Sequence, residues 1–439
     1  MTILNESGIP DVLSPLQAVN DLAERFPGAR VFVVGTRSEA HLAQTLPALT
    51  RSNVTLRPNP RVSFMVLEPD GPPEEGQVAA RTIEAVAGSS DVDLVLVLTG
   101  RPADLLGLDV AFEARLAARR LDLPVKAVDL GSSSACLCTD LEDSVLAALV
   151  EICPGAVSPA EEVVAPPPKR PGFLESLYRR NRDQGSAEPT IPVVLAGALS
   201  QPETMGELAA ELRSAGVAVA GTVPGERAID LPVVDENTVV AVTDPYLTST
   251  ARAFEERGAR VVRTLMPIGI DATGRFVRDV AAAAGRGYNE LGRVREMHQR
   301  LEHLRGRIRG KRVFFAGDTG LEIPLARFLA DAGAVVLEVG APRLDRQLLS
   351  AELQALGSDV DVVESPDWQG QMERIDTVRP DVVIASSGIY VPLVARGHLC
   401  RSSLDFARLG IHGYEGARRI LELFVRTFER AAVLDSVNL

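Results

Sequence analysis

Residues 311–340 read KRVFFAGDTGLEIPLARFLADAGAVVLEVG, and this stretch decides the fold. The run VFFA at 313–316 is apolar without alternation, which is typical of a strand buried on both faces of a sheet. A glycine-containing turn follows at 317–320, and apolar residues then recur at helical spacing as far as Gly333. The chain returns directly afterwards to an apolar run, VVLEV. Strand, helix and strand together predict one βαβ unit, and such units build parallel sheets.

The same pattern occurs several times before this stretch. Short apolar runs that close on a Gly or Thr turn lie at 31–34, 94–98, 125–128, 193–196 and 239–242. Segments with helical spacing separate these runs, as expected of α/β units. We therefore expect an α/β fold of about three Rossmann-like domains with mainly parallel sheets, whose ligands bind at the carboxyl ends of the strands.

Changes in composition suggest where these domains begin and end. Residues 1–153 form the predicted N-terminal α/β domain. Residues 154–189 contain PPP and a charged stretch with little apolar periodicity, so we expect a linker there. A second α/β domain is expected at 190–310, ending in one long bridging helix with an apolar stripe. A third is expected at 311–439, with a C-terminal helix.

The composition is that of a soluble globular protein. Of the 439 residues 46% are hydrophobic and 24% are charged, and the formal net charge is -13. This acidic balance disfavours general nucleic-acid binding. No apolar run approaches the roughly 18 residues that span a bilayer, and the start MTILNESGIPDV lacks the features of a signal peptide. We expect a cytoplasmic protein with neither a nucleic-acid nor a membrane partner.

Few motifs point to chemistry. No G-x-G-x-x-G, P-loop, G-x-S-x-G or H-E-x-x-H pattern occurs. The four cysteines, Cys136, Cys138, Cys153 and Cys400, form no zinc-type pair. In a reducing compartment we expect them to be small buried hydrophobes, the alternative being a metal or cluster site at Cys136 and Cys138.

Three other side chains follow expected strands or turns. His412, in the segment IHGY, lies at an expected turn before a helix, and we expect a hydrogen-bonded structural histidine rather than a functional one. Asp244 and Asp318 follow expected strands, where they either contact a ligand or cap a turn, and we expect capping. The sequence assigns no catalytic residue.

A family resemblance extends along nearly the whole chain. The segment RGKRVFFAGD at 309–318, with LE at 321–322 and LARFL at 325–329, resembles the N subunit of light-independent protochlorophyllide reductase, within the nitrogenase component 1 superfamily. Further matching segments stand in the family's order at 33–37, 142–148, 267–269, 380–384, 392–393, 395–397, 411–413, 417–418 and 420–423. The resemblance implies a nitrogenase component 1-like fold.

The resemblance also implies partners and a reaction. Two N-like subunits assemble with two B-like subunits, and a separate ATP-hydrolysing iron–sulfur reductase protein docks on the heterotetramer. Electrons pass through a [4Fe-4S] cluster at the interface of the two kinds of subunit to a tetrapyrrole. A ring D double bond of that tetrapyrrole is reduced in chlorophyll or bacteriochlorophyll synthesis.

This chain departs from the family at the cluster. The family's N subunit gives three cysteines to it, and the matched motifs align those positions with Ser14, Glu39 and Arg101. Iron–sulfur clusters require soft thiolates, oxygen ligands are poor substitutes, and arginine offers hydrogen-bond donors only. We therefore expect no metal and no cofactor on this chain. We expect a Glu39–Arg101 salt bridge to fill the vacated site, because a charge inside a protein is usually kept beside its opposite.

Three functions are compatible with these observations. The first is an N-like subunit of a protochlorophyllide reductase-type oxidoreductase complex, which the end-to-end resemblance favours. The second is a cluster-less scaffold, tetrapyrrole carrier or regulatory relative, which the replaced cysteines favour. The third is a subunit of a nitrogenase-like system that reduces another substrate.

Overall fold

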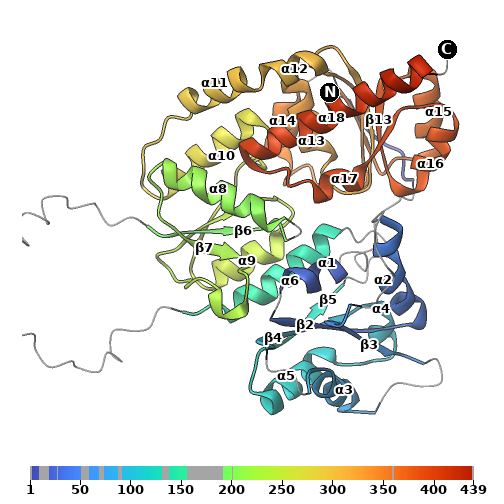
Figure 1. The fold of residues 1–439 in the computed structure, drawn as a ribbon. Coiled ribbons are helices and arrows are strands. Elements are labelled where there is room, and N and C mark those ends of the chain that lie inside the picture. Colours follow the sequence, from blue (N-terminus) through green and yellow to red (C-terminus); the bar gives the residue numbers. More distant parts are fainter. Residues whose placement is uncertain are drawn as a thin grey trace, which may run out of the picture.

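The chain folds into three α/β blocks, each with its own parallel sheet. The computed structural model describes residues 2–8, 19–26, 28–50, 59–68, 74–87, 91–130, 138–155, 191–199, 201–357 and 360–437. The described residues form one six-stranded and two four-stranded sheets, in which all paired strands are parallel. Figure 1 shows the first block (blue to teal) below, the second (green to yellow) at the left and the third (orange to red) above. The predicted α/β class is confirmed.

The stretch that decides the fold forms the predicted βαβ unit. β10 (Arg312–Ala316) and β11 (Val335–Ala341) pair in parallel, and α13 (Glu322–Asp331) connects them. Alternate side chains of β10 pack into two different core clusters, one on each face of the sheet. The apolar run without alternation is therefore explained by a central strand that is covered by helices on both sides.

The other elements of the third block follow in the order expected of repeated strand–helix units. They are α14 (Ser350–Leu356), β12 (Asp361–Glu364), α15 (Trp368–Val378), β13 (Val382–Ala385), α16 (Ser387–Ala395), β14 (Cys400–Ser402), α17 (Ser403–Arg408) and α18 (Gly413–Val437). The expected C-terminal helix is α18, which lies across the front of the block in Figure 1.

The first two blocks have sheets of the same strand order, β3-β2-β4-β5 and β7-β6-β8-β9. The first block contains α1 (Val19–Arg25), β2 (Ala29–Gly35), α2 (Arg37–Thr50), β3 (Val62–Val66), α3 (Gln77–Val86), β4 (Leu94–Thr99), α4 (Arg101–Leu105), α5 (Val110–Leu121), β5 (Val125–Asp129) and α6 (Cys138–Ile152). The second contains β6 (Val193–Ala196), α8 (Pro202–Ser214), β7 (Val219–Val223), η3 (Ala228–Asp230), β8 (Val239–Val242), α9 (Thr248–Glu256), β9 (Arg260–Val262) and α10 (Ile270–Ala283).

The beginning of the chain belongs to the third block. β1 (Thr2–Asn5) pairs in parallel with β12, from Thr2 opposite Asp361 to Asn5 opposite Glu364. The predicted domain at 1–153 therefore does not contain its first strand, because that strand finds its backbone partners at the edge of the third sheet. The division of the rest of the chain at 153, 189 and 310 stays a prediction, and the expected linker lies outside the described residues from 156 onward.

The bridging helix is two helices rather than the one expected. α11 (Leu291–Arg300) and α12 (Glu302–Ile308) meet at Leu301, whose ψ of 5° interrupts the helical path. The expected apolar stripe is nevertheless present, because Met297, Leu301 and side chains of α12 are buried in one core cluster with α18. The stripe therefore continues across the break.

The first two blocks share a core. α6 lies between their sheets and packs against α9, and one cluster joins side chains of β2 and β4 to side chains of β6 and β8. Asp143 of α6 also accepts hydrogen bonds from the backbone N–H groups of Ser249 (2.8 Å) and Thr250 (2.7 Å), in the first turn of α9. A carboxylate of one block thus caps a helix of the next, which fixes the two sheets relative to each other.

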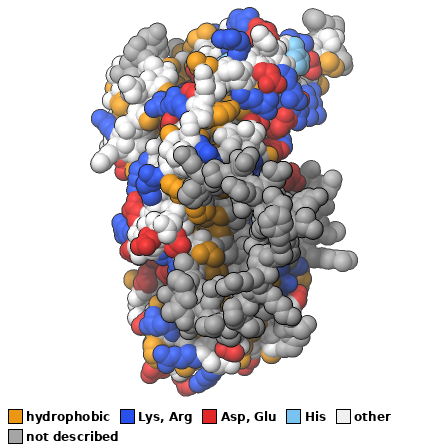
Figure 2. Space-filling view, turned by 90° about the vertical axis from the view of Figure 1, so that its left-hand side faces the viewer, with side chains coloured by type: hydrophobic (Ala, Val, Ile, Leu, Met, Phe, Trp, Pro, Cys, Tyr) orange, Lys and Arg blue, Asp and Glu red, His pale blue; other side chains and the backbone are white. Residues whose placement is uncertain are grey.

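The surface carries both signs of charge. On the face shown in Figure 2, Lys and Arg side chains are interspersed with Asp and Glu side chains, and the described part of that face has no continuous basic stripe of the kind that nucleic acids bind. No helix within the described ranges combines the length and apolarity that crossing a membrane requires.

Candidate functional site

The order of the strands points to one candidate crevice in each block. The first sheet reverses its order between β2 and β4, the second between β6 and β8, and the third between β10 and β13. Ligands of open parallel sheets bind at such a reversal, outside the carboxyl ends of the strands. The residues that directly follow these strands are therefore the candidates for function.

A glycine ends or follows the first of these strands in every block. The three are Gly35, Gly197 and Gly317. A Cβ on the first would lie 2.7 Å from Glu39 Oε2, and Cβ atoms on the second and third would collide with Thr243 and Glu322 respectively. In each case a polar side chain lies directly against the backbone, and at Gly197 a φ of 129° favours glycine as well.

Glu39, one of the three aligned cluster positions, closes the turn after β2. Its Oε2 accepts hydrogen bonds from the backbone N–H of Thr36 (2.6 Å) and from the Thr36 hydroxyl (2.9 Å). In return the Glu39 N–H donates to Thr36 Oγ1 (3.2 Å). Because α2 begins at Arg37, Thr36 is the N-cap of the helix and Glu39 its third residue. The arrangement is a capping box.

The other two blocks close the equivalent turn with a glutamate as well. Glu322 Oε1 accepts from the N–H and the hydroxyl of Thr319, both at 2.9 Å. In the second block the carboxylate comes from a neighbour, since Glu142 Oε1 on α6 accepts from the Leu199 N–H after β6 (3.0 Å). The repeated use of glutamate identifies a structural device of the fold.

Arg101, the third aligned position, is the first residue of α4 and is exposed. It makes no ion pair with Glu39, so the expected salt bridge is wrong. The reason is that the Glu39 carboxylate already has both donors of Thr36 as partners, whereas Arg101 extends into solvent. Ser14, the first aligned position, lies outside the described residues. The structure does not bring the two described positions, Glu39 and Arg101, together as ligands of one group.

Two buried threonine hydroxyls lie at the carboxyl ends of β4 and β8, the second strands of the first two crevices. Thr99 ends β4 and Thr243 follows β8, and their side chains are 9% and 1% exposed. Neither Oγ1 has a hydrogen-bond partner within the part of the chain that the structure describes. The end of the second crevice strand thus carries a buried hydroxyl in both of these sheets.

Two carboxyl groups at the junction of the blocks have raised pKa values. Burial, together with the nearby carboxylates of Glu142 and Asp143, raises the pKa of Asp244 to about 7. Burial likewise raises the pKa of Glu142 to about 6. Asp244 follows β8 and accepts from the Tyr246 N–H (2.8 Å), which confirms the expected turn cap. These two groups hold protons in a pH range where ordinary carboxyls have lost them.

Asp318 also caps a turn, as expected. Its Oδ2 accepts from the N–H and the hydroxyl of Ser387 (3.2 and 3.3 Å) at the start of α16, and its Oδ1 accepts from the Ser403 hydroxyl. The side chain is only 1% exposed. Asp318 thus joins the end of β10 to two helices of the same block, and its oxygens are occupied by structural donors.

His412 differs from the expectation of a hydrogen-bonded histidine. It is buried, and neither Nδ1 nor Nε2 has a partner in the described ranges. Burial lowers its pKa to about 4, so the imidazole is neutral at physiological pH. Backbone contacts place it, through a bridge to Ile268 and a hydrogen bond from the Gly413 N–H to the Pro267 carbonyl (2.7 Å).

A buried ion pair holds the segment against which His412 lies. Arg327 Nε donates to Glu352 Oε2 (2.6 Å), and Arg327 Nη2 donates to the Ile268 carbonyl (3.0 Å). Glu352 Oε1 accepts from the Met266 N–H (2.8 Å). Both charged side chains are 2% exposed. Each charge is thus paired and hydrogen-bonded, the condition under which a buried ion pair is tolerated.

The cysteines of the described chain fit no cluster. Cys153 and Cys400 are buried free thiols, and burial raises their pKa values to about 11 and about 12, so the expectation of buried hydrophobes is confirmed for both. Cys136 and the side chain of Cys138 lie outside the described residues. Within the described ranges no group of three or more His, Cys, Asp or Glu side chains is arranged to hold a metal ion.

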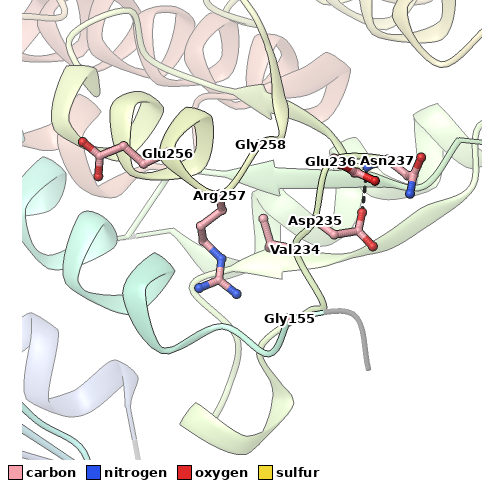
Figure 3. Close-up of a pocket in the computed structure, with 8 residues that line it drawn as sticks. All are labelled: Gly155, Val234, Asp235, Glu236, Asn237, Glu256, Arg257 and Gly258. Carbon is pink, nitrogen blue, oxygen red and sulfur yellow. Dashed lines mark hydrogen bonds between the residues drawn. The ribbon is translucent and has the colours of Figure 1, made fainter. Parts of the chain in front are cut away.

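A separate pocket lies at the amino ends of the strands of the second sheet, opposite the crevice. Its volume is about 630 Å³, and it opens between the loop before β8 and the end of α9. Figure 3 shows the acidic side chains of Asp235 and Glu236 on one side and Arg257 on the other. Arg257 Nη2 is occupied by the Cys153 carbonyl (2.6 Å), so its charge serves to join α9 to the end of α6. None of the candidate residues at the crevices lines this pocket.

The comparisons with known proteins agree with this architecture. The family described as nitrogenase component 1 type oxidoreductase matches residues 77–429, and this chain belongs to that family. A light-independent protochlorophyllide reductase subunit N from Heliobacterium modesticaldum is 34% identical over 99% of this chain and 97% of its own. The corresponding subunit N from a Roseiflexus species is 32% identical over 99% and 95%.

Solved structures show the same fold. A structure described as nitrogenase Cp1 at pH 6.5 superposes with a TM-score of 0.66, covers 98% of this chain and 94% of its own, and is 14% identical. The nitrogenase component 1-like fold expected from the sequence is confirmed. The chain is thus a relative of subunit N of light-independent protochlorophyllide reductase, on the scaffold of the nitrogenase component 1 family.

Proposed function

We propose that this chain is the N-like subunit of a protochlorophyllide reductase-type complex, which reduces a ring double bond of a tetrapyrrole in chlorophyll or bacteriochlorophyll synthesis. The supporting observation is the similarity to curated N subunits over 99% of the chain, at 34% and 32% identity. The fold alone would not carry this proposal, because one scaffold hosts many reactions.

The proposed complex has three protein components. This chain pairs with a B-like subunit, and two copies of each form a heterotetramer. A separate ATP-dependent iron–sulfur reductase protein docks on it and supplies electrons. Reduction of one carbon–carbon double bond takes up two electrons and two protons, so the reductase delivers its electrons in successive steps. The proposal places the complex in the cytoplasm, where ATP is available.

Co-purification tests the proposal. The tagged chain is expressed with a B-like subunit from the same genome, and the purified complex is titrated with protochlorophyllide. We expect the B-like subunit to co-purify and the absorbance of the pigment to shift on binding. Adding the reductase, ATP and dithionite should then produce the absorbance of the reduced pigment.

Two results would contradict the proposal. If neither the B-like subunit nor the pigment binds, the chain has no role in this reaction. If the partner binds and the pigment does not, the complex acts on another substrate. An exposed substitution far from the crevices, Glu236→Gln, serves as a control for the purification and should leave binding unchanged.

A further inference from the structure

The carboxyl end of the first sheet is where the family resemblance places an iron–sulfur cluster, and Glu39 has other partners there. Its carboxylate accepts from both the N–H and the hydroxyl of Thr36, and it lies directly against Gly35. Turning it toward a metal would leave the Thr36 N–H without its acceptor and α2 without its capping box. The Glu39 carboxylate is therefore already used as a hydrogen-bond acceptor at the start of α2.

The third block shows that the same device serves structure alone. Glu322 follows β10 as Glu39 follows β2, it accepts from the N–H and hydroxyl of Thr319, and it lies against Gly317. The aligned cluster positions all fall in the first block, so Glu322 has no counterpart among them. A glutamate in this setting closes a turn without any metal.

Arg101 adds an argument from charge. It begins α4 directly after the Thr99-Gly100 end of β4, on the other side of the crevice from Glu39. A guanidinium is permanently charged and offers donors only, so it cannot ligate iron. Two of the three positions where the family needs thiolates are thus occupied by a permanent cation, Arg101, and by a carboxylate that already caps a helix, Glu39.

We infer that this chain supplies no ligand to a family-type [4Fe-4S] cluster, and that the cluster position has been rebuilt as a helix cap with an exposed arginine beside it. The inference rests on family membership and deepens the proposed function. If the complex works as proposed, electrons reach the substrate without cluster ligands from this chain. Any cluster at the subunit interface is then held by the partner's residues alone.

Iron analysis tests the inference. The full-length chain, alone and with its B-like partner, is purified anaerobically and incubated with ferrous iron and sulfide. Iron and acid-labile sulfide per chain are measured, and EPR spectra are recorded after reduction. The same is done for the combined variant Ser14→Ala, Glu39→Gln and Arg101→Ala. Gln at position 39 closes a capping box as Glu does, so the variant is expected to fold.

Two results support the inference and one overturns it. It is supported if neither the wild-type chain nor the complex holds a cluster, or if a cluster in the complex is unchanged in the combined variant, because the partner then holds it. It is overturned if the wild-type chain or complex holds a [4Fe-4S] cluster that the combined variant loses. The iron measurement on the chain alone needs neither pigment nor partner. Failure of the proposed function can therefore be told apart from failure of this inference.

Discussion

At the scale of single residues, the glutamate at position 39 is explained by the helix that it caps. The segment TRSE at 36–39 has the T-x-x-E spacing of a capping box, and the structure contains the reciprocal bonds of that motif. That signal was present in the sequence and would have corrected the expectation of a salt bridge. A carboxylate that is already used by its own helix is not available to a distant arginine.

Removing this cap has a measurable cost. We expect Glu39→Ala to lower the free energy of unfolding by about 0.5–2 kcal/mol, the usual range for loss of an N-terminal cap. Glu39→Gln should retain most of the stability, since an amide oxygen also accepts from the Thr36 N–H. Urea unfolding of the two variants measures the difference, with the neighbouring exposed substitution Ser38→Ala as control. Equal stability of the Ala and Gln variants would contradict the capping role.

Replacing His412 should affect stability differently from replacing Glu39, because its ring nitrogens have no hydrogen-bond partner to lose. Its folded pKa of about 4 lies below the ordinary value of 6.5, so the unfolded state binds more protons between these values. The stability that the neutral imidazole contributes is present above pH 6.5 and is lost as the pH falls through about 4. We expect His412→Phe to leave the unfolding free energy at pH 7 unchanged or higher and to remove this acid-dependent loss. Urea titrations at pH 7 and pH 5 measure it, and a large loss at pH 7 would contradict the unpaired environment.

The buried Arg327–Glu352 pair depends on both of its members. We expect Arg327→Met to lower the free energy of unfolding by about 3–5 kcal/mol, because Glu352 would remain buried and charged. Adding Glu352→Gln should recover part of this loss, since the amide removes the charge and still accepts from the Met266 N–H. Denaturant unfolding of the single and double variants tests the coupling. Strict additivity of the two substitutions would show that they do not interact.

At the scale of elements, the sequence predicts best where the reason for a strand is local. The runs before Gly35, Gly197 and Gly317 are apolar because both faces of those strands are covered, and each run closes on a glycine turn. β1 offers no such signal, because its side chains are mostly exposed and its pairing partners follow more than 350 residues later. The break at Leu301 gave no signal either, because the apolar spacing continues across it into the same core cluster.

The capping of α9 by Asp143 can be tested directly. We expect Asp143→Ala to speed hydrogen exchange of the Ser249 and Thr250 amides, because both lose a charged acceptor. Asp143→Asn keeps one acceptor oxygen, so at least one of the two amides should remain protected. Exchange measured by mass spectrometry on peptides covering α9 separates the variants. Unchanged protection in the Ala variant would show that the contact between α6 and α9 holds without the cap.

At the scale of the whole molecule, we expect the stability of the junction of the three blocks to depend on the protonation of two carboxyl groups. The folded pKa values of Asp244 and Glu142, about 7 and about 6, lie above those of exposed carboxyls. Their contribution to stability is therefore fully present below about pH 4 and is lost as the pH rises through 6 to 7. We expect Asp244→Asn to remove part of this decline, so that its melting temperature relative to the wild type rises between pH 5 and pH 8. A constant difference across this range would contradict the raised pKa.

The candidate site shows the limit of sequence reasoning at this scale. The positions of Glu39 and Arg101 beside one crevice follow from strand order, because α2 and α4 begin directly after β2 and β4. Their alignment with the family's cluster positions stays a prediction. The hydrogen-bond partners of these two side chains could not be predicted in the same way. The closing of a turn depends on hydrogen-bond geometry, which residue types alone do not specify. The contribution of Glu142 to the turn after β6 was equally inaccessible, since it crosses between blocks.

The pairing of β1 with β12 has a consequence for how the chain is made. Residues 2–5 are synthesised before their backbone partners at 361–364, and two complete α/β blocks lie between the two segments in the chain. The first two blocks share a core and can begin to fold during that interval. The backbone groups of β1 have no partner in the third sheet until β12 has been synthesised, so this edge of the sheet can close only after that point. The order in which β1 and β12 are synthesised therefore does not by itself give the order in which the third sheet is assembled.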